Sequence, residues 1–299
     1  MPVEKPADDK RTIHVFIPDT QVCRESGGNP VPTEHLGWIG QYIVDKYVMR
    51  PNVTLIQIGD HWHMPSLSSY DKGKRTMEGK RYLDDIEVGN AAFDKLCYSY
   101  EEYNRTHRAK WSPNLHYFFG NHEYRIERAT LDNAQLDGTI GYHQLNAGLT
   151  PIEDQQDRQV EHHGWTTHPF LEPVILDGIA YSHYFNNPAN GRPVGGMIET
   201  RIKTIGQSFV QGHQQGLRSG ILETFSGRKR GVVAGSCYLH NEEYRGPQAT
   251  NEWRGILVLY NVHDGDFDLK EVSLASLCRR YEGIDLNKWL RRYYSAWSK

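Results

Sequence analysis

The sequence predicts an α/β fold, and two observations carry that prediction. Short apolar runs of strand length recur along the chain, and most are rich in β-branched or aromatic residues. Helical patterns lie between these runs, at 34–49 and 81–103. The runs are TIHVFIPDTQ (12–21), VTLIQIGDHWH (53–63), LHYFFGNHEYR (115–125), GIAYSHYF (178–185) and SFVQGHQQG (208–216). Runs of this kind that alternate with helices are typical of an α/β sheet.

Both helical patterns are amphipathic. Within 81–103, Ile86, Phe93 and Leu96 recur near helical spacing, and most charged residues lie elsewhere. We expect this face, with its aromatic side chains, to pack in the core rather than to form a site. The pattern at 34–49 is interpreted in the same way.

The chain is predicted to form a single domain over 12–299, after a flexible N-terminal tail at 1–11. Insertions of loops or short helices are expected near 64–110 and 124–170. Beyond about residue 230, the runs GVVAGSCYL, GILVLYNV and DFDLKEVSL alternate with turns such as HDGD, which predicts an antiparallel part of the sheet. The last stretch, NKWLRRYYSAWSK, predicts a terminal helix or tail.

The composition excludes several classes of protein. At 299 residues, with 38% apolar and 24% charged residues, the chain is typical of a soluble globular protein. Its formal charge of −3 gives no overall attraction to a phosphate backbone, so a nucleic-acid partner needs a local basic patch. The four cysteines form no CxxC pair, which favours free thiols in a reducing compartment. No segment has the length of a membrane span or signal sequence, so we expect a cytoplasmic protein with no membrane partner.

Polar residues follow each of the five apolar runs, at the sheet edge where ligands bind in α/β proteins. Taken singly, each is an ordinary turn, cap or strand residue. Together they supply carboxylates, amides and imidazoles but no thiolate, a donor set that suits divalent cations such as Mn²⁺, Fe²⁺, Zn²⁺ or Mg²⁺. They are Asp19, Gln21, Asp60, Asn121, His122, His183, His213 and Gln215. Their order along the chain predicts a metal site.

This order resembles that of the calcineurin-like metallophosphoesterase superfamily, whose pattern is D-x-H, GD, GNH[DE], H and GHxH. The resemblance covers residues 13–215 and is most specific in GNHE, at 120–123. The chain is most similar to phage-encoded members, through the words MPSLSSYDKG, GRPVGG and EYRGPQ. A phage origin would place the protein in the host cytoplasm. The resemblance implies a four-layer α/β/β/α sandwich with two mixed central sheets.

The resemblance also implies two divalent metal ions, with manganese favoured and iron, zinc, magnesium or nickel as alternatives. Asp60 would bridge them, and His122 would donate a hydrogen bond or a proton to the leaving oxygen. Asp60 and His122 are therefore the expected catalytic residues. The expected ligands of the first ion are Asp19, Gln21, Asp60 and Gln215, and those of the second are Asp60, Asn121, His183 and His213.

Gln21 and Gln215 depart from the superfamily pattern, which has histidine at both positions. Both changes fall on the first metal, and a glutamine amide is a neutral, harder and weaker ligand than imidazole. Three hypotheses follow: a weak first site tuned to Mn²⁺, Mg²⁺ or Ca²⁺, a single-metal enzyme, or a site that only binds phosphate. The first is favoured because the other motif residues are all retained.

Three further residues are candidates for substrate contact. Arg125 follows GNHE and could bind phosphate through its guanidinium group, although a solvated helix face explains it equally well. His61 and His63 follow Asp60 and could line the pocket or belong to a loop or cap.

The expected function is hydrolysis of a phosphomonoester or phosphodiester by a metal-bound hydroxide, with a nucleotide or nucleic acid as the expected substrate. One alternative is a DNA or RNA nuclease of the same superfamily, which needs a basic groove. Another is a non-catalytic protein that binds phosphate or a partner. The protein-phosphatase word GDxVDRG is absent, since GDHWHMP stands in its place. The oligomeric state stays open.

Overall fold

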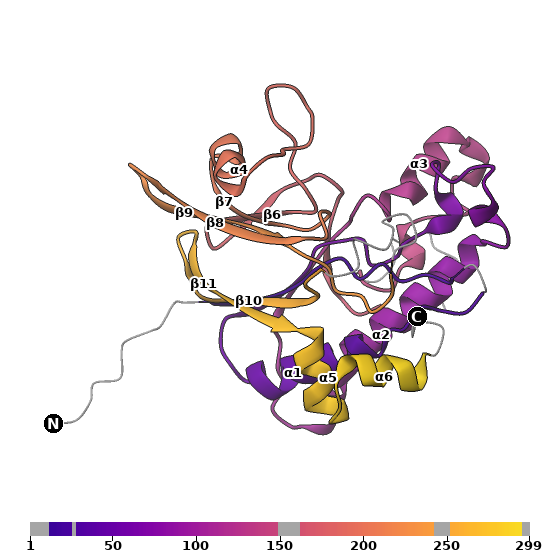
Figure 1. The fold of residues 1–299 in the computed structure, drawn as a ribbon, viewed down its shortest axis with the longest axis horizontal. Helices are drawn as coiled ribbons and strands as arrows, with labels where there is room; N and C mark the ends of the chain where they lie inside the picture. The colour runs from indigo at the N-terminus through magenta and orange to yellow at the C-terminus, as the bar shows by residue number, and fades with distance from the viewer. Residues whose placement is uncertain (1–11, 26–27, 149–161, 242–251, 295–299) are drawn as a thin grey trace.

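Two mixed β-sheets lie at the centre of the computed structural model, which describes residues 12–25, 28–148, 162–241 and 252–294 (Figure 1). The six-stranded sheet has the order β11-β10-β1-β2-β3-β4, and the five-stranded sheet has the order β5-β6-β7-β9-β8. The strands of the first are β1 (Thr12–Ile17), β2 (Val53–Gln57), β3 (Asn114–Phe118), β4 (Thr166–His168), β10 (Gly255–His263) and β11 (Asp266–Ser273). Those of the second are β5 (Val174–Leu176), β6 (Ile179–Ser182), β7 (Ser208–Gln211), β8 (Leu217–Thr224) and β9 (Gly227–Ala234). The predicted α/β class is confirmed.

The five apolar runs form neighbouring parallel strands. β1, β2 and β3 are parallel to one another in the six-stranded sheet, and β6 and β7 are parallel in the five-stranded sheet. Parallel strands end at the same edge of a sheet, so the polar residues that follow them are brought to one side of the molecule.

The antiparallel tail is confirmed in part. β10 and β11 form an antiparallel hairpin around the predicted HDGD turn. The run GVVA, expected beside them, ends β9 in the other sheet, where it is antiparallel to β8 and parallel to β7. Its residues Gly231–Ala234 are all buried, as is usual for a strand covered on both faces, and local sequence does not say which sheet such a strand joins.

Helices cover the outer faces of the two sheets (Figure 1). Helices α1, α2 and α5 pack on the six-stranded sheet, and α4 packs on the five-stranded sheet. The two helical patterns predicted from the sequence are confirmed as α1 and α2. The helices of the described ranges are α1 (Glu34–Tyr47), α2 (Tyr82–Thr106), α3 (Tyr124–Asp132), α4 (Ile198–Ile205), α5 (Leu274–Glu282) and α6 (Leu286–Tyr293), with 3₁₀ turns at Pro65–Leu67, Arg75–Met77, Ala134–Leu136 and Tyr142–Gln144.

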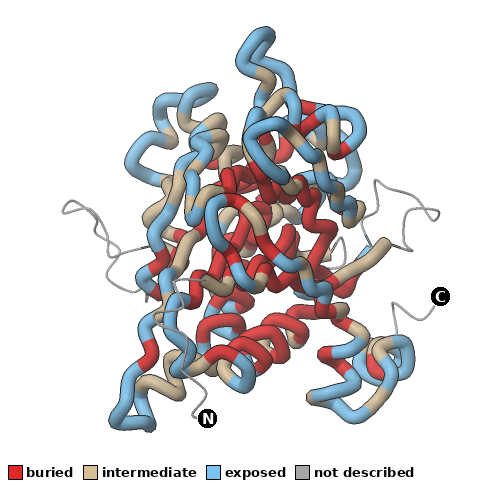
Figure 2. The backbone as a smooth tube through the Cα atoms, turned by 90° about the vertical axis from the view of Figure 1, so that its left-hand side faces the viewer, coloured by how far each residue is buried: buried red, intermediate tan, exposed pale blue. Residues whose placement is uncertain are grey.

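Three apolar layers hold these elements together, and Figure 2 shows the buried backbone concentrated in the middle of the molecule. Ile56 and Val210 belong to the layer between the two sheets. Phe93 of α2 lies in the layer between the six-stranded sheet and its helices, as its helical spacing predicts. Ile202 of α4 packs with Phe209 on the outer face of the five-stranded sheet.

Several predictions concern the chain outside these elements. The tail at 1–11 lies outside the described residues, as does part of the insertion near 124–170. The insertion near 64–110 contains two 3₁₀ turns and α2. The four cysteines all fall in the described ranges and form no disulfide with one another. Among the helices described, none combines the length and apolarity that crossing a membrane requires.

Candidate metal centre

The candidate metal centre lies where strands from both sheets end. Asp19, Asp60 and Asn121 come shortly after β1, β2 and β3 of the six-stranded sheet. His183 and His213 come directly after β6 and β7 of the five-stranded sheet. The centre is therefore assembled from five separated segments, and its geometry depends on how the two sheets pack.

Asp60, His183 and His213 place their ligand atoms within 4.8 Å of one another and could hold a metal ion. Nε2 of His183 lies 3.3 Å from Oδ2 of Asp60 and 3.0 Å from Oδ1 of Asn121. The rings of His183 and His213 meet edge to face, with centroids 5.2 Å apart. The structure thus brings together the four residues that the sequence predicts around the second ion.

The His183 ring is oriented by the end of β2. Its Nδ1 donates a hydrogen bond of 2.7 Å to the carbonyl of Ile58, so Nε2 faces the two acceptor oxygens of Asp60 and Asn121. Such a carbonyl partner is typical behind a metal-binding histidine. Burial lowers the pKa of His183, but the Asp60 and Asp19 carboxylates outweigh it and raise the pKa to about 9. The field that favours a proton here also favours a divalent cation.

Two buried oxygens of the predicted first metal site have no hydrogen-bond partner among the described residues. They are Oδ2 of Asp19 and Oε1 of Gln21, on residues that are 0% and 1% exposed. Oδ1 of Asp19 accepts a hydrogen bond from the His213 amide at 3.1 Å. A buried acceptor without a partner costs about 1–3 kcal/mol, which a cation bound to both oxygens would offset. The residues therefore fit a hard or borderline metal ion.

Charge repulsion also acts on Asp19. Burial raises the pKa of its carboxyl to about 7; nearby His183 opposes this effect, and Asp60 adds to it. By contrast, the pKa of Asp60 lies well below its usual range, because His122 and His183 outweigh the effect of its burial. Two neighbouring buried carboxyl groups with such different pKa values are common in functional sites.

Gln215 is buried, and its side-chain amide forms a hydrogen bond within the protein. Its Oε1 accepts a hydrogen bond of 2.7 Å from the Tyr238 hydroxyl. The Tyr238 ring stacks on His240 and carries the Arg254 guanidinium above it. Nothing in the sequence singles out Tyr238, which lies in the strand-like run GVVAGSCYL. Gln215 as a metal ligand stays a prediction.

Three of the predicted ligands have left-handed backbone conformations. The φ angles of Gln21, Asp60 and His213 are 44°, 52° and 64°. Non-glycine residues avoid this region, and the strain of about 1–3 kcal/mol each is commonly found at functional sites. Gly120 lies so close to Asp60 that a Cβ there would come within 2.2 Å of Oδ1. The chain is thus bent at three points to aim these side chains.

His122 lies at the edge of the centre. Its Nε2 is 3.7 Å from Oδ2 of Asp60, and its Nδ1 donates to the carbonyl of His63 at 3.0 Å. The backbone amide of His122 also donates to Oδ1 of Asp60 at 3.0 Å. The predicted acid is therefore oriented with Nε2 towards the Asp60 carboxylate.

Arg125 contacts His122 rather than open space. Its Nη2 donates to Nε2 of His122 at 3.3 Å, and its Nη1 donates to the carbonyls of His63 and Met64 at 2.9 and 3.1 Å. Three of the five guanidinium N–H donors are thus engaged, two of them by the loop after β2. The structure supports a positioning role for Arg125, and direct substrate contact stays a prediction.

The two histidines that follow Asp60 point in different directions. His61 is fully buried: its Nε2 donates to the Gly89 carbonyl at 3.0 Å and its Nδ1 accepts from the Thr20 hydroxyl at 2.7 Å. Burial lowers its pKa to about 4. Both ring nitrogens of His61 are therefore used inside the protein, which favours a structural role, and substrate contact stays a prediction. The His63 ring is half-buried against His122, with centroids 4.6 Å apart, and remains a candidate.

Glu123 organises the loop that carries Asp60, and its role was missed in the sequence. The residue is 0% exposed and accepts hydrogen bonds of 2.7–3.0 Å from five donors. These are the amides of Asp60, His61, Trp62 and Gly120 and the hydroxyl of Tyr117. The sequence signal for this role is the glutamate that ends GNHE, because a buried carboxylate can accept hydrogen bonds from several amides at once.

A second group of side chains, which the sequence did not single out, lies between α2 and the segment before β4. Cys97, Glu101 and His163 place ligand atoms within 4.8 Å of one another and could hold a metal ion. The His163 nitrogens lie 2.8 Å from Asp94 and 2.6 Å from Glu101. Burial lowers the pKa of His163, but hydrogen bonds to Asp94, Cys97 and Glu101 raise it to about 12. The group thus ties this segment to one face of α2.

No protein-family model and no curated protein matches the sequence.

Proposed function

We propose that this protein is a metal-dependent phosphoesterase that hydrolyses a phosphomonoester or phosphodiester. The observation that carries the proposal is the convergence of Asp60, Asn121, His183 and His213 from separate strand ends, beside the unpartnered oxygens of Asp19 and Gln21. The order of helix, sheet, sheet and helix supports the four-layer sandwich of the calcineurin-like superfamily, which the motif order resembles.

In this proposal the centre holds two divalent ions, with Mn²⁺ favoured. Asp19, Gln21 and Asp60, with Gln215 as a further candidate, hold the first, while Asp60, Asn121, His183 and His213 hold the second. Such a pair of ions polarises the phosphate and lowers the pKa of water. The amide ligands predict a first site that is weaker than the second and disfavours soft ions.

The remaining residues of the proposed site would transfer a proton or hold other residues in position. His122 keeps one proton on Nδ1, at the His63 carbonyl, and presents Nε2 towards Asp60. To donate to the leaving oxygen, His122 would have to carry a second proton, on Nε2, in place of the hydrogen bond that this nitrogen accepts from Arg125. Arg125 holds the His122 ring in place, and Glu123 holds the backbone of Asp60.

The test combines metal binding with turnover. Mn²⁺ is titrated into metal-stripped protein by calorimetry, and hydrolysis of bis(p-nitrophenyl) phosphate and p-nitrophenyl phosphate is measured with and without added Mn²⁺. Asp60→Asn and His213→Ala are expected to weaken Mn²⁺ binding at least about tenfold and to abolish turnover. His263→Ala, which removes an exposed histidine at the end of β10, is the matched control.

Three outcomes separate the alternatives. Metal-dependent turnover that is lost in Asp60→Asn supports the phosphoesterase. Tight Mn²⁺ binding without turnover of either ester would favour a phosphate-binding protein, the alternative raised by Gln21 and Gln215. Full activity in Asp60→Asn would rule out this residue as the bridge between two ions.

A further inference from the structure

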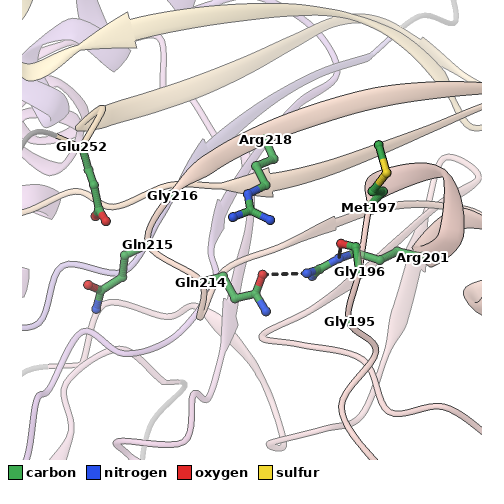
Figure 3. A pocket seen from close by; sticks show the side chains of 9 residues that line it. All are labelled: Gly195, Gly196, Met197, Arg201, Gln214, Gln215, Gly216, Arg218 and Glu252. Carbon is green, nitrogen blue, oxygen red and sulfur yellow. Dashed lines mark hydrogen bonds between the residues drawn. The ribbon is translucent and has the colours of Figure 1, made fainter. Parts of the chain in front are cut away.

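A pocket of about 570 Å³ opens beside the candidate metal centre (Figure 3). Gln214 and Gln215, which directly follow the predicted ligand His213, line it together with Arg201 of α4 and Arg218 of β8. This volume lies within the range of small-molecule sites and far exceeds that of a water molecule. The pocket can therefore accept a chemical group that continues from the metal centre.

Arg201 is an unusually buried cation in the wall of this pocket. Its residue is 2% exposed, and its Nε and Nη2 donate to the Gly196 carbonyl at 3.0 Å and to Oε1 of Gln214 at 2.7 Å. Both acceptors are neutral, and Nη1 has no hydrogen-bond partner among the described residues. Gly196 belongs to the segment GRPVGG, which takes no part in the candidate metal centre. A buried charge without a counter-charge is costly, so an anion at this position would be stabilising.

A second guanidinium group strengthens the positive field. The Arg218 side chain is exposed and makes no hydrogen bond or ion pair with another described residue. Burial lowers the pKa of Arg201, and repulsion from Arg218 lowers it further. Glu252, which has contacts of its own, is the acidic residue of the lining, so two arginines and one glutamate leave a net charge of +1. Figure 3 shows both guanidinium groups on the side of the pocket where Gln214 lies.

We propose that this pocket is an anion subsite that binds a second phosphate group of the substrate. This inference rests on the proposed function, because it places the reacting phosphate at the metal centre and its neighbour between Arg201 and Arg218. Guanidinium groups bind phosphate oxygens through paired, charge-assisted hydrogen bonds. The substrate class is then a molecule with at least two phosphate groups, such as a nucleotide chain with a terminal phosphate.

The first experiment measures binding to the full chain. Calorimetry with metal-stripped protein compares the dinucleotide TpT, its 5′-phosphorylated form pTpT and inorganic phosphate. We expect pTpT to bind about tenfold more tightly than TpT, and Arg218→Gln to remove this difference. Lys203→Ala, which removes an exposed positive charge two residues after Arg201, is the matched control and should keep it. Arg201→Lys keeps the charge but loses the paired donors and should give an intermediate affinity.

The results distinguish this subsite from its alternatives. Equal binding of pTpT and TpT by the wild type, or an unchanged preference in Arg218→Gln with a native circular dichroism spectrum, would overturn the proposal. Binding of inorganic phosphate without preference for pTpT would also contradict it, since the pocket would then serve free phosphate.

The second experiment separates the subsite from the proposed function. With Mn²⁺ added, the KM for pTpT should rise about tenfold in Arg218→Gln, while hydrolysis of bis(p-nitrophenyl) phosphate should be unchanged. Binding of pTpT that depends on Arg218, without any turnover, would contradict the phosphoesterase and retain the anion site. Turnover with the same KM in Arg218→Gln would retain the phosphoesterase and contradict the subsite.

Discussion

Single side chains set the geometry of the candidate centre. Glu123 satisfies five buried donors, and Oε1 of Gln21 has no hydrogen-bond partner among the described residues. The first residue holds the backbone of Asp60, and in the proposed function the second would influence which ions the first site prefers. Both effects can be tested by single substitutions of Glu123 and Gln21.

Glu123→Gln should destabilise the fold and weaken metal binding together. The amide nitrogen of glutamine cannot accept the hydrogen bonds that one carboxylate oxygen receives, so buried amides lose their partner. We expect the free energy of unfolding to fall by about 2 kcal/mol in urea denaturation. Glu172→Gln, an exposed control, should change neither property, and an equal loss in both variants would contradict the assigned role of Glu123.

Gln21→His should move the metal preference towards softer ions. Imidazole binds Zn²⁺ more strongly than an amide oxygen does, and Oε1 of Gln21 has no competing hydrogen bond, whereas that of Gln215 is held by Tyr238. The ratio of Zn²⁺ to Mn²⁺ affinity should rise about tenfold in calorimetric titrations. An unchanged ratio would count against Gln21 as a ligand.

At the scale of elements, helix α2 stabilises a segment close to the candidate centre. Asp85 of α2 accepts a hydrogen bond of 3.0 Å from the Ser66 amide, which anchors the segment after β2 to this helix. The carboxyl is 1% exposed, and burial raises its pKa to about 6, with hydrogen bonds from Ser66 opposing the shift. The titration of Asp85, in α2, therefore contributes to the pH dependence of the stability of the fold.

The sign of that dependence follows from the raised pKa. The folded state holds the Asp85 proton more tightly than the unfolded chain, so the contribution is complete below pH 4 and is lost as pH rises through 6. Relative to Asp85→Asn, the wild type should lose on the order of 2–3 kcal/mol between pH 4 and pH 7. Urea denaturation at several pH values measures the difference, and parallel curves for the two proteins would contradict it.

Local patterns explain which elements could be predicted. β1, β2, β3, β6 and β7 are continuous apolar runs bounded by turn residues, and α2 has a clear helical period, so the sequence alone identifies them. The sheet to which β9 belongs depends on distant pairing, which the local sequence does not reveal. His61 and His63 have equal claims in the sequence, and only the packing of Trp62 and α2 turns the first inward.

At the scale of the whole molecule, the centre joins two sheets. The order of motifs predicted which residues meet, because parallel strands end on one side. It could not predict the Arg201 pocket, whose walls come from α4, β8 and the loop after β7. Nor could it predict the group around His163, where residues 94–101 meet a segment far along the chain. Both depend on tertiary packing rather than on periodicity.

Metal binding should therefore stabilise the whole fold. Ions that bind only the native arrangement add about 2.7 kcal/mol at a hundredfold excess over Kd. The thermal midpoint should rise by several degrees when Mn²⁺ saturates the protein and should stay constant in Asp60→Asn. Differential scanning fluorimetry across a Mn²⁺ titration measures both, and an equal rise in the two proteins would contradict binding at Asp60.

The distribution of ligands along the chain has a consequence for the moment of metal uptake. Asp19 and His213 are separated by almost 200 positions but touch through a hydrogen bond in the native structure. During synthesis, the early strands emerge long before the later ones, and none of the early segments holds a complete set of donors. In the proposed function, ions could therefore bind only once both sheets have docked. Metal binding would then report that the two sheets are assembled.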